Sequence, residues 1–303
     1  MLDYHRTLLQ DATRMTALRE AIARAVRAGD VVVDLGCGTG ILSFLAIEAG
    51  ARRVYSIERE HLADVTAFLA RHLRYADRIT VLHDASTSLE LPERADVLLT
   101  ETIGSAGLDE NILGFVIDAK KRLLRDNATI VPRRIALVSA PIDARDAYEK
   151  QIGCWNDPRF GFDFSPLRVF ASNAMMLLHV KDEMHIAEER ELVEVDLATC
   201  DSTLVDGSGA FVATRDGTVH GFAVWFRATL IDGVELSNRE RTSESWAQAF
   251  FPLEEPVPVT RGTTMSLELQ TDDGKSWRWR GNVGDVAFDQ TTWLNRPPCI
   301  KRD

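Results

Sequence analysis

The chain has 303 residues, of which 35 are Lys or Arg and 46 are Asp or Glu, so its formal net charge is −11 at pH 7. This acidic balance argues against a nucleic-acid partner and mildly favours a cationic substrate. An apolar content of 45% with 27% charged residues is typical of a folded globular protein, and no apolar run approaches the roughly 20 residues that span a bilayer, so we expect no membrane partner.

The N-terminus and the cysteines indicate the compartment. Residues 1–14 are mixed in charge and lack the apolar core of a signal peptide. The four cysteines (Cys37, Cys154, Cys200 and Cys299) form no CxxC pair, and the seven histidines are scattered, so we expect no metal site. We therefore predict a cytoplasmic protein with reduced thiols.

The first part of the chain alternates between helical and strand-like patterns. Apolar residues at helical spacing over 4–26 predict one helix, and the run of valines at 31–35 predicts a buried parallel strand. Further along we expect helices at 41–50, 64–75 and 108–125, and strands at 54–57, 79–82 and 95–100. This alternation predicts an α/β fold with a doubly wound parallel sheet in a domain covering residues 1–132.

Pro132 marks a change of pattern. From Arg134 onward, eight strand-like runs are separated by Gly, Asp and Pro turns, which predicts an antiparallel β-barrel or sandwich over residues 133–303. One helical excursion, at about 144–173, interrupts these strands and carries four aromatic residues (Trp155, Phe160, Phe162 and Phe164). Such side chains need a covering surface, either on a partner subunit or on their own domain.

A glycine-rich turn, Gly36-Cys37-Gly38-Thr39-Gly40, follows the first predicted strand, and Glu58 ends the second strand 22 residues after Gly36. Strand, glycine turn, helix, strand and acid form the layout of a nucleotide site. The alternating glycines differ from the dinucleotide fingerprint, whose third glycine comes three residues after the second, and no Lys-Ser/Thr follows to make a P-loop. Asp34, two residues before the turn, is suited to holding a cationic amino group.

Two glutamates flank the next strand end. Glu101 follows the strand at 95–100, at the sheet edge where ligands bind in open parallel sheets. Glu110 lies nine residues later at the start of the predicted helix, where a favourable interaction with the helix dipole is the alternative explanation. Two carboxylates facing across a small loop can grip a planar guanidinium, leaving one nitrogen a better nucleophile.

These motifs resemble those of a known family. The string DLGCGTG at 34–40 is similar to motif I of class I S-adenosylmethionine-dependent methyltransferases. The Glu-x8-Glu spacing resembles the double-E loop of the protein arginine methyltransferase family, and the pattern from His5 to Arg14 resembles that family's N-terminal helix. Residues 245–251 resemble the strand that begins with the family's Thr-His-Trp loop, and the excursion at 144–173 occupies the place of its dimerisation arm.

The resemblance implies S-adenosylmethionine as cofactor and a homodimer. It implies that Gly36, Gly38, Thr39 and Gly40 let the backbone approach the cofactor and that Glu58 accepts from the ribose hydroxyls. It also places Ser86 beside the adenine, pairs Arg14 with the cofactor carboxylate, makes Glu101 and Glu110 catalytic and assigns Trp246 to substrate binding. Each position also has a plainer explanation: a surface acid for Glu58, a loop serine for Ser86, an exposed helix arginine for Arg14 and a core tryptophan for Trp246.

Three departures from the family pattern bear on the substrate. Thr-His-Trp is replaced by Glu244-Ser245-Trp246, which removes the histidine that would pair with Asp11, and the usual Trp-Met of the double-E loop is Thr102-Ile103. The family's Tyr-Phe-x-x-Tyr helix would lie upstream of residue 4 and is not expected here. A more open site favours free arginine or a small guanidine over a protein arginine side chain.

Three functions remain open at this point. The first is an enzyme that methylates a guanidine nitrogen, either of free arginine or of a protein arginine. The second uses the same cofactor on an amine, hydroxyl or amide of another small molecule. The third is a catalytically idle scaffold that retains the fold, as the missing histidine suggests.

Overall fold

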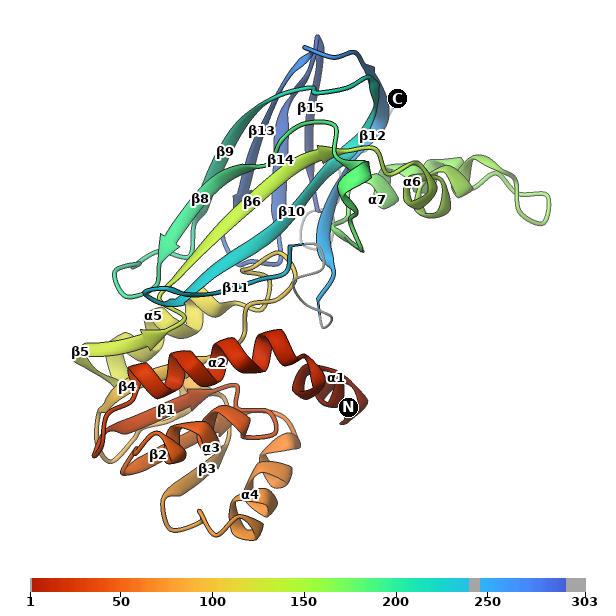
Figure 1. Cartoon of the computed structure of the whole chain (residues 1–303). Coiled ribbons are helices and arrows are strands. Elements are labelled where there is room, and N and C mark those ends of the chain that lie inside the picture. The colour runs from red at the N-terminus through yellow and green to blue at the C-terminus, as the bar shows by residue number, and fades with distance from the viewer. Residues whose placement is uncertain (1, 240–245, 293–303) are drawn as a thin grey trace.

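A computed structural model describes residues 2–239 and 246–292. Figure 1 shows two units stacked on each other, with a parallel sheet and its helices below and two antiparallel sheets above. A helical arm projects sideways from the upper unit. None of the helices within the described ranges is long and apolar enough to cross a membrane.

The lower unit is a five-stranded parallel sheet with the order β3-β2-β1-β4-β5. Its strands are β1 (Val31–Leu35), β2 (Arg53–Glu58), β3 (Ile79–His83), β4 (Ala95–Thr100) and β5 (Leu124–Val131). Strand β1 is buried throughout because it lies mid-sheet with helices over both faces. The predicted doubly wound sheet is confirmed, and the chain reverses its direction of travel between β1 and β4, which opens a crevice at their carboxyl ends.

The helices of this unit differ from prediction at two places. They are α1 (Leu2–Gln10), α2 (Ala12–Ala25), α3 (Ile41–Glu48), α4 (Leu62–His72) and α5 (Ile112–Arg122). The single helix predicted at 4–26 was wrong, because Asp11 ends α1 and caps α2 by accepting a hydrogen bond from the Arg14 N–H at 3.0 Å. The helix predicted at 108–125 begins only at Ile112. The Asp109 carboxylate accepts hydrogen bonds from the Ser105 and Ala106 N–H groups and folds the preceding residues into a tight loop.

Strand β5 was not predicted. Its sequence, LRDNATIV, exposes most of its first half, so the pattern lacks the continuous apolar run of a buried parallel strand. It pairs with β4 at the edge of the sheet, where partial exposure is tolerated.

The upper unit contains two antiparallel sheets. Its strands are β6 (Arg134–Ile142), β7 (Met176–Leu178), β8 (Arg190–Asp196), β9 (Val205–Val212), β10 (Gly217–Ile231), β11 (Val234–Ser237), β12 (Gln248–Val259), β13 (Thr264–Thr271), β14 (Trp277–Val283) and β15 (Val286–Thr291). One sheet has the order β7-β12-β10-β6-β8, with β11 paired to β10, and the other has the order β15-β14-β13-β9. The eight predicted runs all overlap strands, which confirms the antiparallel prediction, whereas β11 and β15 were not predicted.

Aromatic side chains fill the space between the two upper sheets. Phe251 on β12 packs edge-on against Trp277 and Trp279 on β14, with ring centroids 5.5 and 5.3 Å apart. Both indole N–H groups reach backbone carbonyls, those of Gly274 at 2.8 Å and Pro252 at 2.9 Å. The large side chains are therefore buried without leaving an indole donor unsatisfied.

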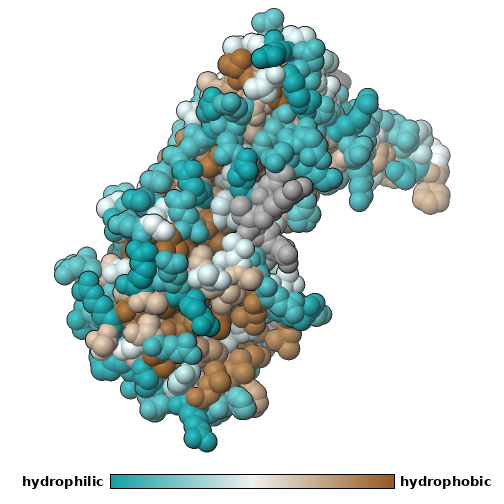
Figure 2. Space-filling model, viewed as in Figure 1, coloured by the Kyte–Doolittle hydropathy of each residue, from teal (hydrophilic) through white to brown (hydrophobic). Residues whose placement is uncertain are grey.

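The arm consists of α6 (Arg145–Gln151), α7 (Arg168–Ser172) and two 3₁₀ turns, Gly153–Asn156 and Ser165–Leu167. Phe160 at its far end is fully exposed, and Phe162 and Phe164 are also exposed. Figure 2 shows a mostly hydrophilic arm with hydrophobic atoms at its end, and a second gathering of hydrophobic side chains on the lower unit near α1 and α4. Of the two possibilities for these phenylalanines, the arm does not fold them back onto its own domain.

Candidate active site

A cavity of about 630 Å³ lies at the carboxyl ends of β1, β2, β3 and β4. Helices α1 and α2 form part of its wall, and the upper unit contributes Trp246 and Lys275. Nine of the predicted site residues line it: Arg14, Gly36, Gly38, Thr39, Glu58, Ser86, Glu101, Glu110 and Trp246. Two predicted residues, Asp34 and Gly40, are not part of the wall. The crevice predicted from the parallel strand order is thus closed by elements that come before and after the sheet.

The glycine turn after β1 has a backbone that side chains would block. Gly36 and Gly38 have φ values of +73° and +54°, a region that L residues rarely adopt. A Cβ at Gly36 would lie 2.9 Å from the Thr102 side chain, and one at Gly38 would lie 2.9 Å from the ring of His5. The turn therefore needs glycine both for its shape and for the close approach of α1 and the double-E loop.

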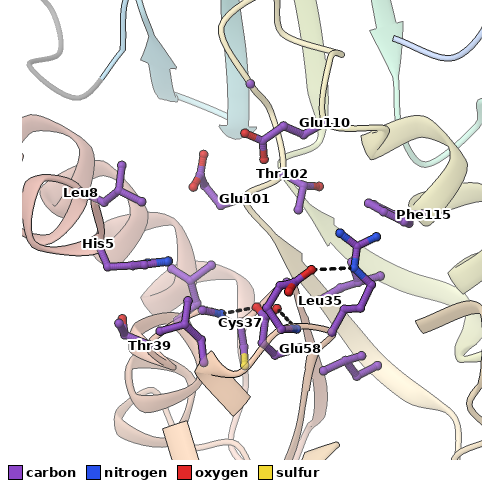
Figure 3. Close-up of a pocket in the computed structure, with 18 of the residues that line it drawn as sticks. His5, Leu8, Leu35, Cys37, Thr39, Glu58, Glu101, Thr102, Glu110 and Phe115 are labelled. Carbon is purple, nitrogen blue, oxygen red and sulfur yellow. Dashed lines mark hydrogen bonds and ion pairs between the residues drawn. The ribbon is translucent and has the colours of Figure 1, made fainter. Parts of the chain in front are cut away.

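Glu58 at the end of β2 is fixed by backbone groups. Its Oε2 accepts a hydrogen bond from the Gly38 N–H at 3.0 Å, and its Oε1 accepts one from the Glu60 N–H at 2.8 Å (Figure 3). An ionised carboxylate offers about four lone-pair positions, so two acceptor positions remain for a ligand. This arrangement fits a cofactor that brings a pair of hydroxyl groups.

Asp34 lies behind the glycine turn, in the interior of the unit. The Ser43 hydroxyl donates to its Oδ2 at 2.6 Å and also contacts the Ser56 hydroxyl at 2.6 Å. Complete burial raises the pKa of Asp34 to about 7, and its Oδ1 is buried without a hydrogen-bond partner among the described residues. The predicted contact of Asp34 with a cationic amino group stays a prediction, because the structure brings the carboxylate under the turn and not to the cavity.

Gly40 also has a structural setting. It precedes α3 with a φ of +83°, and a Cβ there would lie 2.7 Å from the Thr66 side chain on α4. Thr66 in turn donates a hydrogen bond to the Gly38 carbonyl at 2.6 Å. The third glycine therefore allows α4 to pack against the turn, and its predicted role as a cofactor ligand is not tested by this contact.

The double-E loop, residues 101–110, presents its two glutamates to the same space. Figure 3 shows the carboxylates of Glu101 and Glu110 directed toward a common region above Glu58, with Thr102 beneath them. Protein atoms packed around Glu110 raise the pKa of its carboxyl, the charge of Asp109 adds to the rise, and Arg14 opposes it. Two acids in one partly enclosed cavity create a strong preference for a cation.

Arg14 on α2 connects the predicted cofactor and substrate ends of the cavity. Its guanidinium forms an ion pair with Glu101 and lies over the ring of Trp246, with the guanidinium carbon 4.3 Å from the centroid. Burial lowers the pKa of Arg14 to about 10, so it remains charged at neutral pH. Trp246 is buried edge-on against Phe226, 5.1 Å between centroids. Glu101 therefore already holds one guanidinium in this structure.

Sequence reasoning missed two residues at this site. Asn238 is buried after β11 and donates to the carbonyls of Ser105 and Ala247 at 2.8 Å each, while its Oδ1 accepts from the Phe226 N–H at 2.8 Å. It thereby ties the double-E loop to the segment that carries Trp246. Lys275 enters the cavity wall from the turn between β13 and β14. A lone asparagine at a strand end and a lysine in a polar turn carry no signal in the sequence. Glu244 and Ser245, which replace the expected Thr-His, lie outside the described residues.

Comparison with known proteins finds a methyltransferase-related family for each half of the chain. Residues 134–286 match the family described as the arginine methyltransferase oligomerization subdomain, and residues 11–127 match that of ribosomal protein L11 methyltransferase (PrmA). Arginine N(omega)-methyltransferase from Streptomyces achromogenes subsp. streptozoticus is 32% identical over 281 residues, which cover 89% of this chain and 76% of the relative. Protein arginine N-methyltransferase 6 from Danio rerio is 31% identical over 283 residues, covering 88% and 80%.

Solved structures share the whole arrangement of the two units. The Trypanosoma brucei PRMT1 enzyme–prozyme heterotetrameric complex with AdoHcy matches with a TM-score of 0.85 at 23% identity, covering 95% of this chain and 96% of that one. Arabidopsis thaliana protein arginine methyltransferase 10 matches with a TM-score of 0.79 at 21% identity, covering 96% and 97%. At these identities the likeness concerns the fold.

Proposed function

The chain belongs to the arginine methyltransferase family and is an S-adenosylmethionine-dependent arginine N-methyltransferase, and we propose that Glu101 and Glu110 hold the guanidine that it methylates. The observation that carries this assignment is the pair of carboxylates in one cavity, one of which already binds the guanidinium of Arg14. A neutral acceptor, such as a hydroxyl or amide, would not need two acids. An idle scaffold would not need an open cavity that meets the glycine turn.

The cofactor end of the cavity fits S-adenosylmethionine through Glu58, Arg14 and Ser86. When bound, S-adenosylmethionine supplies an electrophilic methyl group on its sulfonium sulfur. The two remaining acceptor positions of Glu58 suit the ribose hydroxyls, and Ser86, buried in the cavity wall after β3, suits the adenine side. Arg14 lines the same cavity and carries a positive charge, which suits the cofactor carboxylate.

At the substrate end, Glu101 and Glu110 accept hydrogen bonds from the guanidinium and draw its positive charge toward the nitrogens they contact. The remaining nitrogen keeps its lone pair and is directed at the methyl group. Transfer to that nitrogen would form a carbon–nitrogen bond, break the methyl–sulfur bond with its electron pair left on sulfur, and release a proton from the guanidinium nitrogen that Glu110 contacts. The raised pKa of Glu110 makes it a better proton acceptor than an ordinary carboxylate, so we assign it that role.

We assign the cofactor to residues 1–132 and one wall of the substrate site to residues 133–303, and we assign the protein to the cytoplasm. The last assignment is supported by Cys37, Cys154 and Cys200, which are free thiols.

For the assembly, we propose a homodimer in which the arm at 144–173 covers the cofactor domain of a partner subunit. The exposed Phe160 and Phe162 supply the apolar surface on the arm, and the exposed Phe68 and Leu73 at α4 supply a receiving surface.

Phe160→Asp should convert a dimer to a monomer in light scattering at micromolar concentration, because a buried charge opposes the contact. Val286→Asp, at an exposed apolar position on β15, is the control. A wild-type monomer, or a dimer that survives Phe160→Asp, contradicts the arrangement.

The function is tested with labelled cofactor and a panel of acceptors: free L-arginine, an Arg/Gly-rich peptide, histone and a neutral hydroxyl compound. Label should appear on arginine-containing acceptors and not on the hydroxyl compound. Transfer to the neutral acceptor with arginine inert supports a different acceptor class. Calorimetry that detects no binding of S-adenosylmethionine supports the idle scaffold.

A further inference from the structure

Lys275 is the basic side chain that the upper unit adds to the cavity wall, among the wall residues that the structure describes. It is exposed, and within the described ranges no carboxylate lies at ion-pair distance from its ammonium group. It lines the same cavity as Glu101, Asp109 and Glu110.

The turn that carries Lys275 is held in one shape by its own side chains. The Asp273 Oδ1 accepts hydrogen bonds from the N–H groups of Lys275 at 2.8 Å and Ser276 at 2.6 Å. The Thr271 hydroxyl accepts one from the Gly274 N–H at 2.9 Å, and the buried indole of Trp277 donates to the Gly274 carbonyl. Lys275 therefore projects from a fixed base.

This base is packed directly on the double-E loop. Gly274 has a φ of +70°, and a Cβ there would lie 1.9 Å from the Leu108 carbonyl oxygen and 3.2 Å from the Asp109 Cα. Gly274 immediately precedes Lys275, and Asp109 immediately precedes Glu110. The backbone contact between Gly274 and Asp109 therefore fixes the backbone of Lys275 relative to that of Glu110.

We propose that Lys275 binds the α-carboxylate of free L-arginine while Glu101 and Glu110 hold its guanidinium. The inference rests on the proposed methylation of a guanidine and names the substrate class for the same site. Two acids alone would accept any guanidinium, whereas a cation in the wall of the same cavity complements a molecule that carries a guanidinium at one end and a carboxylate at the other. An arginine inside a protein has an amide in place of the carboxylate, so Lys275 favours the free amino acid.

The test compares L-arginine with agmatine, which is arginine without its carboxylate. Dissociation constants are measured by calorimetry in the presence of S-adenosylhomocysteine for the wild type, Lys275→Gln and Lys121→Gln. Lys121 is an exposed lysine in the last turn of α5 and does not line the cavity, so it controls for net charge. KM and kcat for both ligands are measured alongside.

Lys275→Gln should weaken L-arginine binding about tenfold, the scale of one hydrogen bond between charged groups, and should not weaken agmatine binding. Lys275→Glu should lower the ratio of L-arginine to agmatine affinity further, because the new acid repels the α-carboxylate of L-arginine, whereas agmatine carries an ammonium and no carboxylate at that end. Lys121→Gln should change neither ligand. In kinetics the loss should fall on KM for L-arginine, with kcat preserved.

The inference is overturned if Lys275→Gln leaves L-arginine affinity unchanged, or weakens both ligands equally. That result would leave the proposed function intact, provided that the wild type methylates either guanidine. Conversely, a wild type that methylates no guanidine, yet loses L-arginine affinity selectively in Lys275→Gln, refutes the proposed function and supports the binding role of Lys275.

Discussion

Replacing Glu101 by Gln removes one negative charge from the substrate site and keeps the size of the side chain. The side chain of Glu101 is only 14% exposed, so solvent screens its interactions weakly. The amide keeps one acceptor oxygen but turns an N–H donor toward the donors of the guanidinium. The variant therefore loses a charge-assisted hydrogen bond, which contributes about 1.5 to 3 kcal/mol. If that bond is present in the transition state, kcat/KM for arginine should fall by roughly 10- to 150-fold.

The assay measures initial rates with labelled cofactor, and calorimetry measures S-adenosylmethionine affinity on the same preparation. Cofactor affinity should stay within about threefold of wild type, because the ribose and adenine contacts are made elsewhere. Glu268→Gln is the matched control. Glu268 also forms an ion pair, with Arg280, but this pair is exposed on the upper unit. A rate close to wild type in Glu101→Gln would refute the guanidine-gripping role. So would a loss that is reproduced in Glu268→Gln.

Three further substitutions or conditions test other parts of the site. Glu58→Gln should weaken cofactor binding by about tenfold in calorimetry, because the neutral amide forms no charge-assisted hydrogen bonds with the ribose hydroxyls. Unchanged cofactor affinity, with a rise in KM for arginine at saturating cofactor, would contradict this role of Glu58. The pKa of Glu110 is raised, and its ionised form is needed to hold the guanidinium. On acidification, kcat/KM for arginine should therefore begin to fall at a pH above the usual pKa of a glutamate carboxyl. Glu110→Gln should lack this acid limb, and a limb that persists in it must come from another group. Asn238→Ala should lower the free energy of unfolding in urea by about 3 kcal/mol, since three buried backbone groups lose their partner, and should reduce kcat at saturating substrate. A fully active and stable Asn238→Ala would show that this bridge does not position the loop.

The parts of the site that could be predicted from the sequence are motifs of closely spaced residues, whose spacing indicates their chemistry. The alternating glycines require positive φ values at fixed positions, and Glu58 and Glu101 follow strands whose carboxyl ends must meet at one edge. Such features depend on a few neighbouring residues and on the parallel order of the strands. The antiparallel strands of the second half could be predicted for the same reason, because alternating apolar residues and turn residues are local features of the sequence.

The parts that were missed depend on contacts between distant segments. Asp11 looks like one more polar position in a helical stripe until its side chain caps α2, and β5 is hidden because an edge strand tolerates charged residues. Asn238 and Lys275 join the site through the packing of the upper unit on the double-E loop, which the sequence does not indicate. Asp34 shows a different limit, because it lies in the buried strand β1 with its carboxylate bonded to Ser43, and its predicted contact with a cationic amino group stays a prediction.

The most direct test of the account is the product formed by the wild-type protein from labelled S-adenosylmethionine and free L-arginine. Mass spectrometry with fragmentation should find one or more added methyl groups, all located on guanidine nitrogens. A protein that binds the cofactor but leaves L-arginine and arginine-containing peptides unlabelled, or that places the methyl on the α-amino group, would contradict the assignment of Glu101 and Glu110 as the guanidine grip.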